Sequence, residues 1–194
     1  MPDSNITKVI RERRSIKQFK NDSISKDVIF ELLNIAAWAP NHGLREPWRF
    51  VLFMEDGREQ LAEAIINAPI KGGKKKSPEM VHKKIMTAPI HLLVLMEEDP
   101  RQREWEEDFA AACVFIQNLQ LAAWERGIGT IWKTEPYIYS PYFREKVGVK
   151  PGEKVVGLIH AGYPEKIPEG IARTAIEEKA NVIGNWEAAG IVEA

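Results

Sequence analysis

The stretch "WEEDFAAACVFIQNLQLAAWER", Trp105 to Arg126, decides the fold of this chain of 194 residues. Its spacing predicts one long helix. Apolar residues fall on nearly every face of that helix: Phe109, Ala110, Ala111, Ala112, Cys113, Phe115, Ile116, Leu119, Leu121, Ala122 and Ala123. A helix that is apolar on all sides is buried. Because a chain of this size rarely encloses a long helix completely, we expect a second copy of the chain to cover part of it, in a homodimer.

Short apolar runs on both sides of this helix predict a sheet. The predicted strands are Arg49–Met54, Ile90–Met96, Thr130–Trp132 and Lys154–Ala161. The other predicted helices run from Ile6 into the arginines that follow, from the N-cap Ser25 to Ala39 at most, over Gly57–Asn67, from the N-cap Ser77, and from Ser140–Pro141 to Gly148. No repeat or linker interrupts these elements, so we expect residues 1–194 to form a single domain.

The composition argues against several classes of partner. The 27 Lys and Arg residues nearly balance the 28 Asp and Glu residues, so neither duplex nucleic acid nor an anionic membrane is an expected partner. The longest apolar run, Ile90–Met96, is too short to span a bilayer, and the N-terminus lacks the apolar core of a signal peptide. Cys113 is the only cysteine, so no intrachain disulfide can form. We therefore expect a cytoplasmic protein.

The usual catalytic signatures are missing from the sequence. The four histidines, His42, His82, His91 and His160, show no metal-binding spacing, so no metal site is expected. His91 and His160 lie in strand-like apolar runs, which favours a hydrogen-bonded structural role. The segment "GIGTIW" leads from a helix into a strand, the reverse of a dinucleotide-binding fingerprint. A chain without an evident acid, base or nucleophile is typical of enzymes whose chemistry resides in a cofactor.

The segment "VIRERRSIKQF", Val9 to Phe19, places several cations at the end of the first predicted helix. Two interpretations fit this spacing. Cations at a helix C-terminus gain roughly 0.3 to 1 kcal/mol from the macrodipole. Alternatively, the guanidinium groups and Ser15 bind phosphate oxygens while Lys17 reaches another part of the same ligand. Spacing alone leaves both interpretations open.

Together with three later segments, this element resembles the FMN-dependent nitroreductase family, and in particular its short NAD(P)H nitroreductases. "RRSIKQF" is similar to the family's R-[RH]-S-x-[KR]-x-F element, and "AAWAPNHGLREPWRF" to an element that ends in Q-P-W-x-F. "GIGTIWKT" and "VVGLIHAGYPEK" resemble its later glycine-containing strands. One departure is Glu46, which stands where many members have glutamine; an ionised carboxylate cannot donate a hydrogen bond.

The resemblance implies an α+β fold: a three-layer α/β/α sandwich with a mixed, largely antiparallel sheet, in an interlocked homodimer with FMN at the interface. It implies that Arg13, Arg14 and Ser15 contact the phosphate and ribityl chain of FMN. Lys17 would approach the N1 and O2 edge of the flavin. Arg173, in "IARTAIEE", would complete the phosphate site.

The resemblance also assigns residues to the remaining sides of the cofactor. Trp38 and His42 would come from the partner chain, and Trp132, Lys133 and Thr134 would line the opposite side. For Trp38 a structural role, capping the core of the second helix, stays open as an alternative.

The reaction that the resemblance implies is a ping-pong transfer. NAD(P)H reduces FMN and leaves, and an electron-poor acceptor such as a nitroaromatic or a quinone then takes up the hydride. No catalytic side chain is implied, because the flavin carries the chemistry while Lys17 tunes it. Two alternatives are a specialised enzyme that consumes flavin or removes halogen, and a non-catalytic binder of flavin or of polyanions through Lys71–Lys76. That basic loop could also gate the nicotinamide phosphate or be a solvated turn.

Overall fold

The computed structural model describes residues 5–69 and 77–184, and its centre is a four-stranded sheet in the order β1-β2-β4-β3. The strands are β1 (Trp48–Met54), β2 (Ile90–Glu97), β3 (Gly129–Lys133) and β4 (Glu153–Gly162). All three ladders are antiparallel, and an isolated parallel bridge joins Ser15 to Thr130 at the β3 edge. The four predicted strands therefore form.

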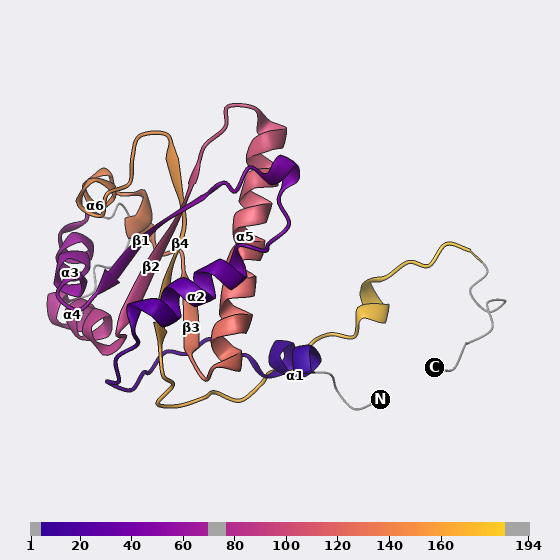
Figure 1. Ribbon diagram of the computed structural model, residues 1–194, viewed down its shortest axis with the longest axis horizontal. Coiled ribbons are helices and arrows are strands. Elements are labelled where there is room, and N and C mark those ends of the chain that lie inside the picture. The colour runs from indigo at the N-terminus through magenta and orange to yellow at the C-terminus, as the bar shows by residue number, and fades with distance from the viewer. Residues whose placement is uncertain (1–4, 70–76, 185–194) are drawn as a thin grey trace.

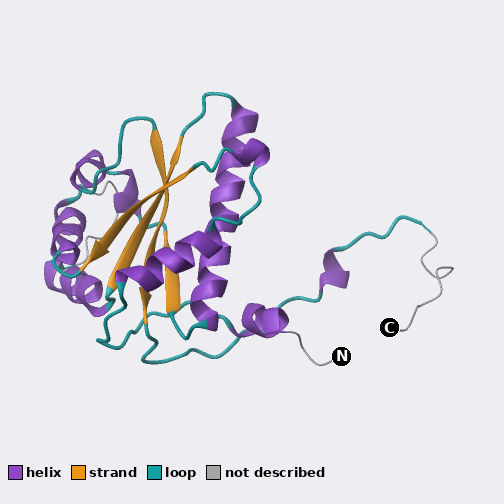
Figure 2. Cartoon of the chain, in the orientation of Figure 1, coloured by secondary structure: helices purple, strands orange, loops and turns teal. Residues whose placement is uncertain are grey.

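Helices cover both faces of this sheet, which gives three layers (Figures 1 and 2). On one face lie α2 (Lys26–Ala36) and α5 (Gln102–Glu125); on the other lie α3 (Gly57–Asn67), α4 (Pro78–Thr87) and α6 (Pro141–Lys146). The remaining helices are α1 (Asn5–Glu12) and the 3-10 turns η1 (His42–Leu44), η2 (Pro136–Tyr139) and η3 (Ile176–Lys179). The predicted three-layer α+β fold is confirmed. The basic loop Lys71–Lys76 lies outside the described residues.

Two apolar cores fill the spaces between the layers. Successive residues of β2 point to opposite faces, so Leu92 and Val94 join the core beneath α2 and α5, whereas Leu93 and Leu95 join the core beneath α3 and α6. Burial on both faces explains why this strand is a continuous apolar run. The N-caps Ser25 and Ser77 accept hydrogen bonds from the first turns of α2 and α4, as predicted.

The long helix α5 is buried on one face only. Phe115 and Ile116 are fully buried, whereas Val114 is exposed and Leu121 is half-buried on the side that points away from the sheet. The apolar character of this second side, which made the helix conspicuous in the sequence, is not explained by contacts within one chain.

A pair of buried histidines links β2 to β4. His91 and His160 face each other in register, with their Nδ1 atoms 2.5 Å apart, and His91 Nε2 lies 2.9 Å from the carbonyl oxygen of Ile85. Burial lowers the pKa of His91 to about 4 and lowers that of His160 well below its usual value. Both rings are therefore neutral at neutral pH: His91 donates to Ile85 and accepts from His160. The predicted structural role is confirmed.

We expect the free energy of unfolding to fall as the pH drops from about 6.5, the usual pKa of histidine, to about 4, the pKa of buried His91. In this window the unfolded chain binds protons that the folded chain excludes, so this stability is complete above the window and is lost on acidification. The loss from His91 is about 3 kcal/mol at the acidic end. The measurement is the midpoint of urea unfolding at several pH values across the window. The control is His82→Gln, which removes an exposed histidine beside Glu59. A midpoint that is independent of pH between about 7 and 5 contradicts the expectation.

Candidate active site

The segment that carries the arginines is fixed beside the β3 edge like an additional short strand. Its backbone is bonded on two sides: Ile16 donates to the carbonyl oxygen of Thr130 at 3.0 Å, and Glu165 donates to that of Gln18 at 3.0 Å. Ile16 and Phe19 are buried and anchor the segment in a small apolar core. Ser15 and Lys17, which flank Ile16, are exposed at the surface.

Three guanidinium groups gather where α1 ends. Arg14 donates from Nη1 to the carbonyl oxygens of Arg11 and Arg13, at 2.6 and 2.8 Å, and its guanidinium lies against Gly170. A Cβ at that glycine would come within 2.0 Å of Arg14 Nη2, so a larger residue there would make the Arg14 side chain shift. Burial, together with the positive charges of Arg14 and Arg173, lowers the pKa of Arg13.

Arg13 is the member of this cluster that has an unsatisfied hydrogen-bond donor. Within the described residues, its Nη1 is buried and has no hydrogen-bond partner. A buried donor without a partner costs roughly 1 to 3 kcal/mol, and the neighbouring cations add repulsion. An oxyanion such as a phosphate would satisfy the donor and relieve the repulsion together. The two interpretations left open by the sequence thus divide: Arg14 bonds to the end of α1, whereas Arg13 keeps a donor that an anion could satisfy.

A groove of about 410 Å³ adjoins this cluster. It is lined by Ser15, Lys17, Gln18, Lys166, Pro168, Glu169 and Ile171. One wall is the predicted segment; the other wall, 166–171, was not predicted as part of the site. The only signal for it in the sequence is its position directly after the glycine-containing element "HAGYPEK".

The β3 edge adds backbone groups to the same region. Because Thr130 presents its carbonyl oxygen to Ile16, the backbone of Trp132 also points away from β4, by the alternation of an antiparallel ladder. The indole of Trp132 is used differently: Nε1 donates to the carbonyl oxygen of Val156 at 3.2 Å and the ring covers Gly157. Lys133 is half-buried and Thr134 is exposed.

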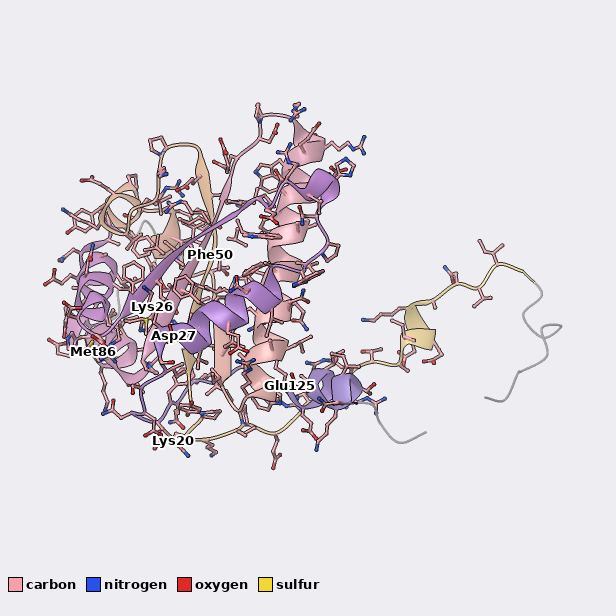
Figure 3. The ribbon with its side chains drawn as sticks, viewed as in Figure 1. Lys20, Lys26, Asp27, Phe50, Met86 and Glu125 are labelled. Atoms are coloured by element: carbon pink, nitrogen blue, oxygen red, sulfur yellow. The ribbon has the colours of Figure 1, made fainter. Side chains whose placement is uncertain are left out.

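The loop between α2 and β1, which carries His42, lies toward the other end of α5. This loop is tied to Asp108 through Arg45, whereas α1 is tied to Glu125, which accepts from Asn5 at 2.5 Å. Figure 3 labels Glu125, which lies beside α1. Asp108 and Glu125 are about 25 Å apart along the helix, at a rise of about 1.5 Å per residue. The predicted residues therefore form two separate groups in one chain. Trp38 is 88 % exposed, so the alternative that it caps the core is wrong.

Other types of site find no support in the described part of the chain. No three His, Cys, Asp or Glu residues there are grouped so that they could hold a metal ion. Among the helices of residues 5–69 and 77–184, none combines the length and the apolar character needed to cross a membrane.

Comparison with known proteins finds relatives that match most of the chain. The model of the family described as "Nitroreductase family" matches residues 10–163. A protein of Bacillus subtilis (strain 168) named "Putative NAD(P)H nitroreductase YfhC" is 38 % identical over 179 residues, which cover 88 % of this chain and 90 % of that protein.

Two solved structures share the fold. A nitroreductase-like family protein from Bacillus cereus is 43 % identical, with a TM-score of 0.89 over 95 % of this chain and 99 % of the other. A nitroreductase from Desulfovibrio desulfuricans, solved in complex with FMN, has a TM-score of 0.74 at 21 % identity, over 94 % and 99 % of the two chains.

Proposed function

The chain belongs to the nitroreductase family, and from that membership we propose that it is an FMN-dependent NAD(P)H oxidoreductase that reduces electron-poor acceptors such as nitroaromatics or quinones. The observation that carries the proposal is the buried, unpartnered Nη1 of Arg13, which lies near the guanidinium groups of Arg14 and Arg173. These groups fit the FMN phosphate, a dianion with several acceptor oxygens.

The bound FMN would supply the hydride chemistry, and the chain would supply binding, orientation and charge. Arg13, Arg14 and Arg173 would hold the phosphate. The hydroxyl of Ser15 and the outward backbone of Trp132 would bond along the cofactor, while the indole of Trp132 stays in the core. Lys17, in the adjoining groove, would place its positive charge beside the flavin.

The site would be completed by a second copy of the chain. His42 cannot reach the arginines of its own chain, because most of the length of α5 separates them. Two copies with antiparallel α5 helices would bring the His42 end of one chain over the Arg13 end of the other. The homodimer predicted from the sequence is therefore part of this proposal.

The surface that would mediate this contact is an apolar groove of about 400 Å³ between α1, α2 and α5. It is lined by Asn5, Ile6, Val9, Ile35, Asn118, Leu121, Ala122 and Glu125. The segment after β4 runs past α1 and away from the sheet (Figure 1), and it exposes the apolar side chains of Ile171, Ile176 and Val182. Exposed apolar side chains in the groove and on this arm support burial against another copy.

The colour of the purified protein tests this function directly. A flavoprotein of the proposed kind is yellow, releases FMN on heating, and bleaches when NADPH or NADH is added without oxygen. Reoxidation by a nitroaromatic or a quinone then separates an oxidoreductase from a non-catalytic flavin binder. A colourless protein that cannot be loaded with FMN overturns the proposal.

We expect Lys17→Ala to lower the reduction potential of bound FMN. Reduced flavin carries negative charge near N1, so removal of a nearby ammonium destabilises it. A loss of about 1 kcal/mol, the upper value for an exposed charge pair, corresponds to about 20 mV in a two-electron couple. The measurement is a redox titration of both proteins. Lys20→Ala, on the same segment but outside the groove, is the control, and an unchanged potential in Lys17→Ala removes Lys17 from this role.

A further inference from the structure

The loop that joins α2 to β1 is held in an unfavourable backbone conformation. Leu44 and Glu46 have φ angles of 52° and 46°, in the left-handed region, beside Gly43 at 62°. Outside glycine, this conformation costs roughly 1 to 2 kcal/mol per residue. It persists only where surrounding contacts enforce it. The loop therefore depends on its anchors.

Two side chains anchor this loop. Asn41 closes its base: Oδ1 accepts from the backbone N–H of Glu46 at 2.9 Å, and Nδ2 donates to the carbonyl oxygen of Ala39 at 3.1 Å. Arg45 ties it to α5 with a two-pronged contact, Nε to Asp108 Oδ1 at 3.0 Å and Nη2 to Asp108 Oδ2 at 2.7 Å. Arg45 Nη2 also donates to Asp99 at 3.0 Å.

The anchor on α5 is a buried charge. Asp108 is 4 % exposed, whereas the side chain of Arg45 is about one-third exposed. Taking a carboxylate out of water costs several kcal/mol, so a pair of this kind adds little net stability. The two-pronged contact instead fixes the orientation of the Arg45 side chain, because the planar guanidinium donates to both carboxylate oxygens in one geometry.

The fixed loop carries a residue of the proposed cofactor site. The backbone N–H of Arg45 donates to the carbonyl oxygen of His42 at 3.4 Å, so the position of Arg45 sets that of the η1 turn. His42 is exposed, and within the described residues its side chain makes no hydrogen bond that would hold it independently of this turn. Its placement toward a partner chain therefore depends on the contact between Arg45 and α5.

We propose that Asp108 is a positioning residue, which acts through Arg45 to preset His42 and its turn for the FMN site of the partner chain. The proposal rests on the proposed function. It assigns a role across the subunit boundary to a carboxylate that lies far from the phosphate-binding arginines of its own chain.

The test compares Asp108→Asn with Glu107→Gln. The control removes the neighbouring carboxylate of α5, which pairs with Arg103 at 2.9 Å and, among the described residues, forms no ion pair with the loop. The dissociation constant of FMN is measured by flavin fluorescence during titration of apo-protein, well below the melting temperature of every variant. The melting temperature of the apo-protein and the oligomeric state are measured beside it. Arg45→Lys, which keeps the charge but loses the planar fork, is the second variant if Asp108→Asn does not fold.

We expect Asp108→Asn to raise the dissociation constant of FMN by about tenfold, the usual effect of losing a residue that supports a binding group. The protein should stay dimeric, Arg45→Lys should show a smaller change of the same sign, and Glu107→Gln should bind as the wild type does. A lower melting temperature with unchanged FMN affinity would mean a structural role and overturns the proposal, as does a variant that has become monomeric. Failure of the wild type to bind FMN instead refutes the proposed function.

Discussion

Replacing Arg13 with methionine is expected to weaken FMN binding by roughly tenfold to a hundredfold, the effect of losing one charge-assisted hydrogen bond of about 1.5 to 3 kcal/mol. The apo-protein should be at least as stable as the wild type, because the substitution removes a buried donor that has no partner and a cation that faces two others. Binding and stability would thus change in opposite directions, which a residue with only a structural role would not show.

The measurements for Arg13→Met are an FMN titration and a urea unfolding curve of the apo-protein. Lys8→Met is a matched control: it removes one positive charge from the exposed surface of α1, before the phosphate cluster begins. If Arg13→Met retains full FMN affinity, the assignment of the cluster to a phosphate is wrong. If the apo-protein is strongly destabilised, the interpretation of Arg13 as a group awaiting a ligand is wrong.

The second large effect is expected from Ile35→Glu. Ile35 is 42 % exposed and lines the groove between α1, α2 and α5, so a carboxylate there is tolerated in a single chain but would be buried without a partner between two copies. We expect the variant to be monomeric and to lose FMN, while the unfolding free energy of its monomer differs from that of the wild-type chain by no more than about 0.5 kcal/mol.

Sedimentation and the ratio of FMN to protein check the Ile35→Glu expectation. Met80→Glu is the control, since Met80 is 63 % exposed on α4, on the opposite face of the sheet. It should leave the assembly and the cofactor unchanged. An Ile35→Glu protein that is still dimeric and fully loaded would show that this groove is not the contact surface.

Features that depend on neighbouring residues in the sequence were predicted well. The caps Ser25 and Ser77, the bounds of α3 and the four strands follow from local hydrogen bonding and from apolar alternation, and all are present in the fold. The family resemblance is confirmed by the match over residues 10–163. It could be seen in the sequence because its motifs are short and local.

Features that depend on tertiary contacts were not predicted. The groove wall 166–171 meets Ser15 only because the chain returns beside β3, and Arg45 meets Asp108 across 63 positions of sequence. The sequence also did not show that the half-buried indole of Trp132 packs over Gly157 and donates to Val156. That the remaining candidate residues bind FMN stays a prediction.

The length of α5 has a genetic consequence. Each proposed site combines the arginine end of one chain with the His42 end of its partner. A change at Arg13 and a change at His42 in the same chain would therefore affect two different sites. A dimer of one chain altered at Arg13 and one altered at His42 then contains one doubly damaged site and one intact site. Two alleles that are each inactive alone would complement each other when expressed together, whereas an allele carrying both changes would impair both sites when paired with a normal chain.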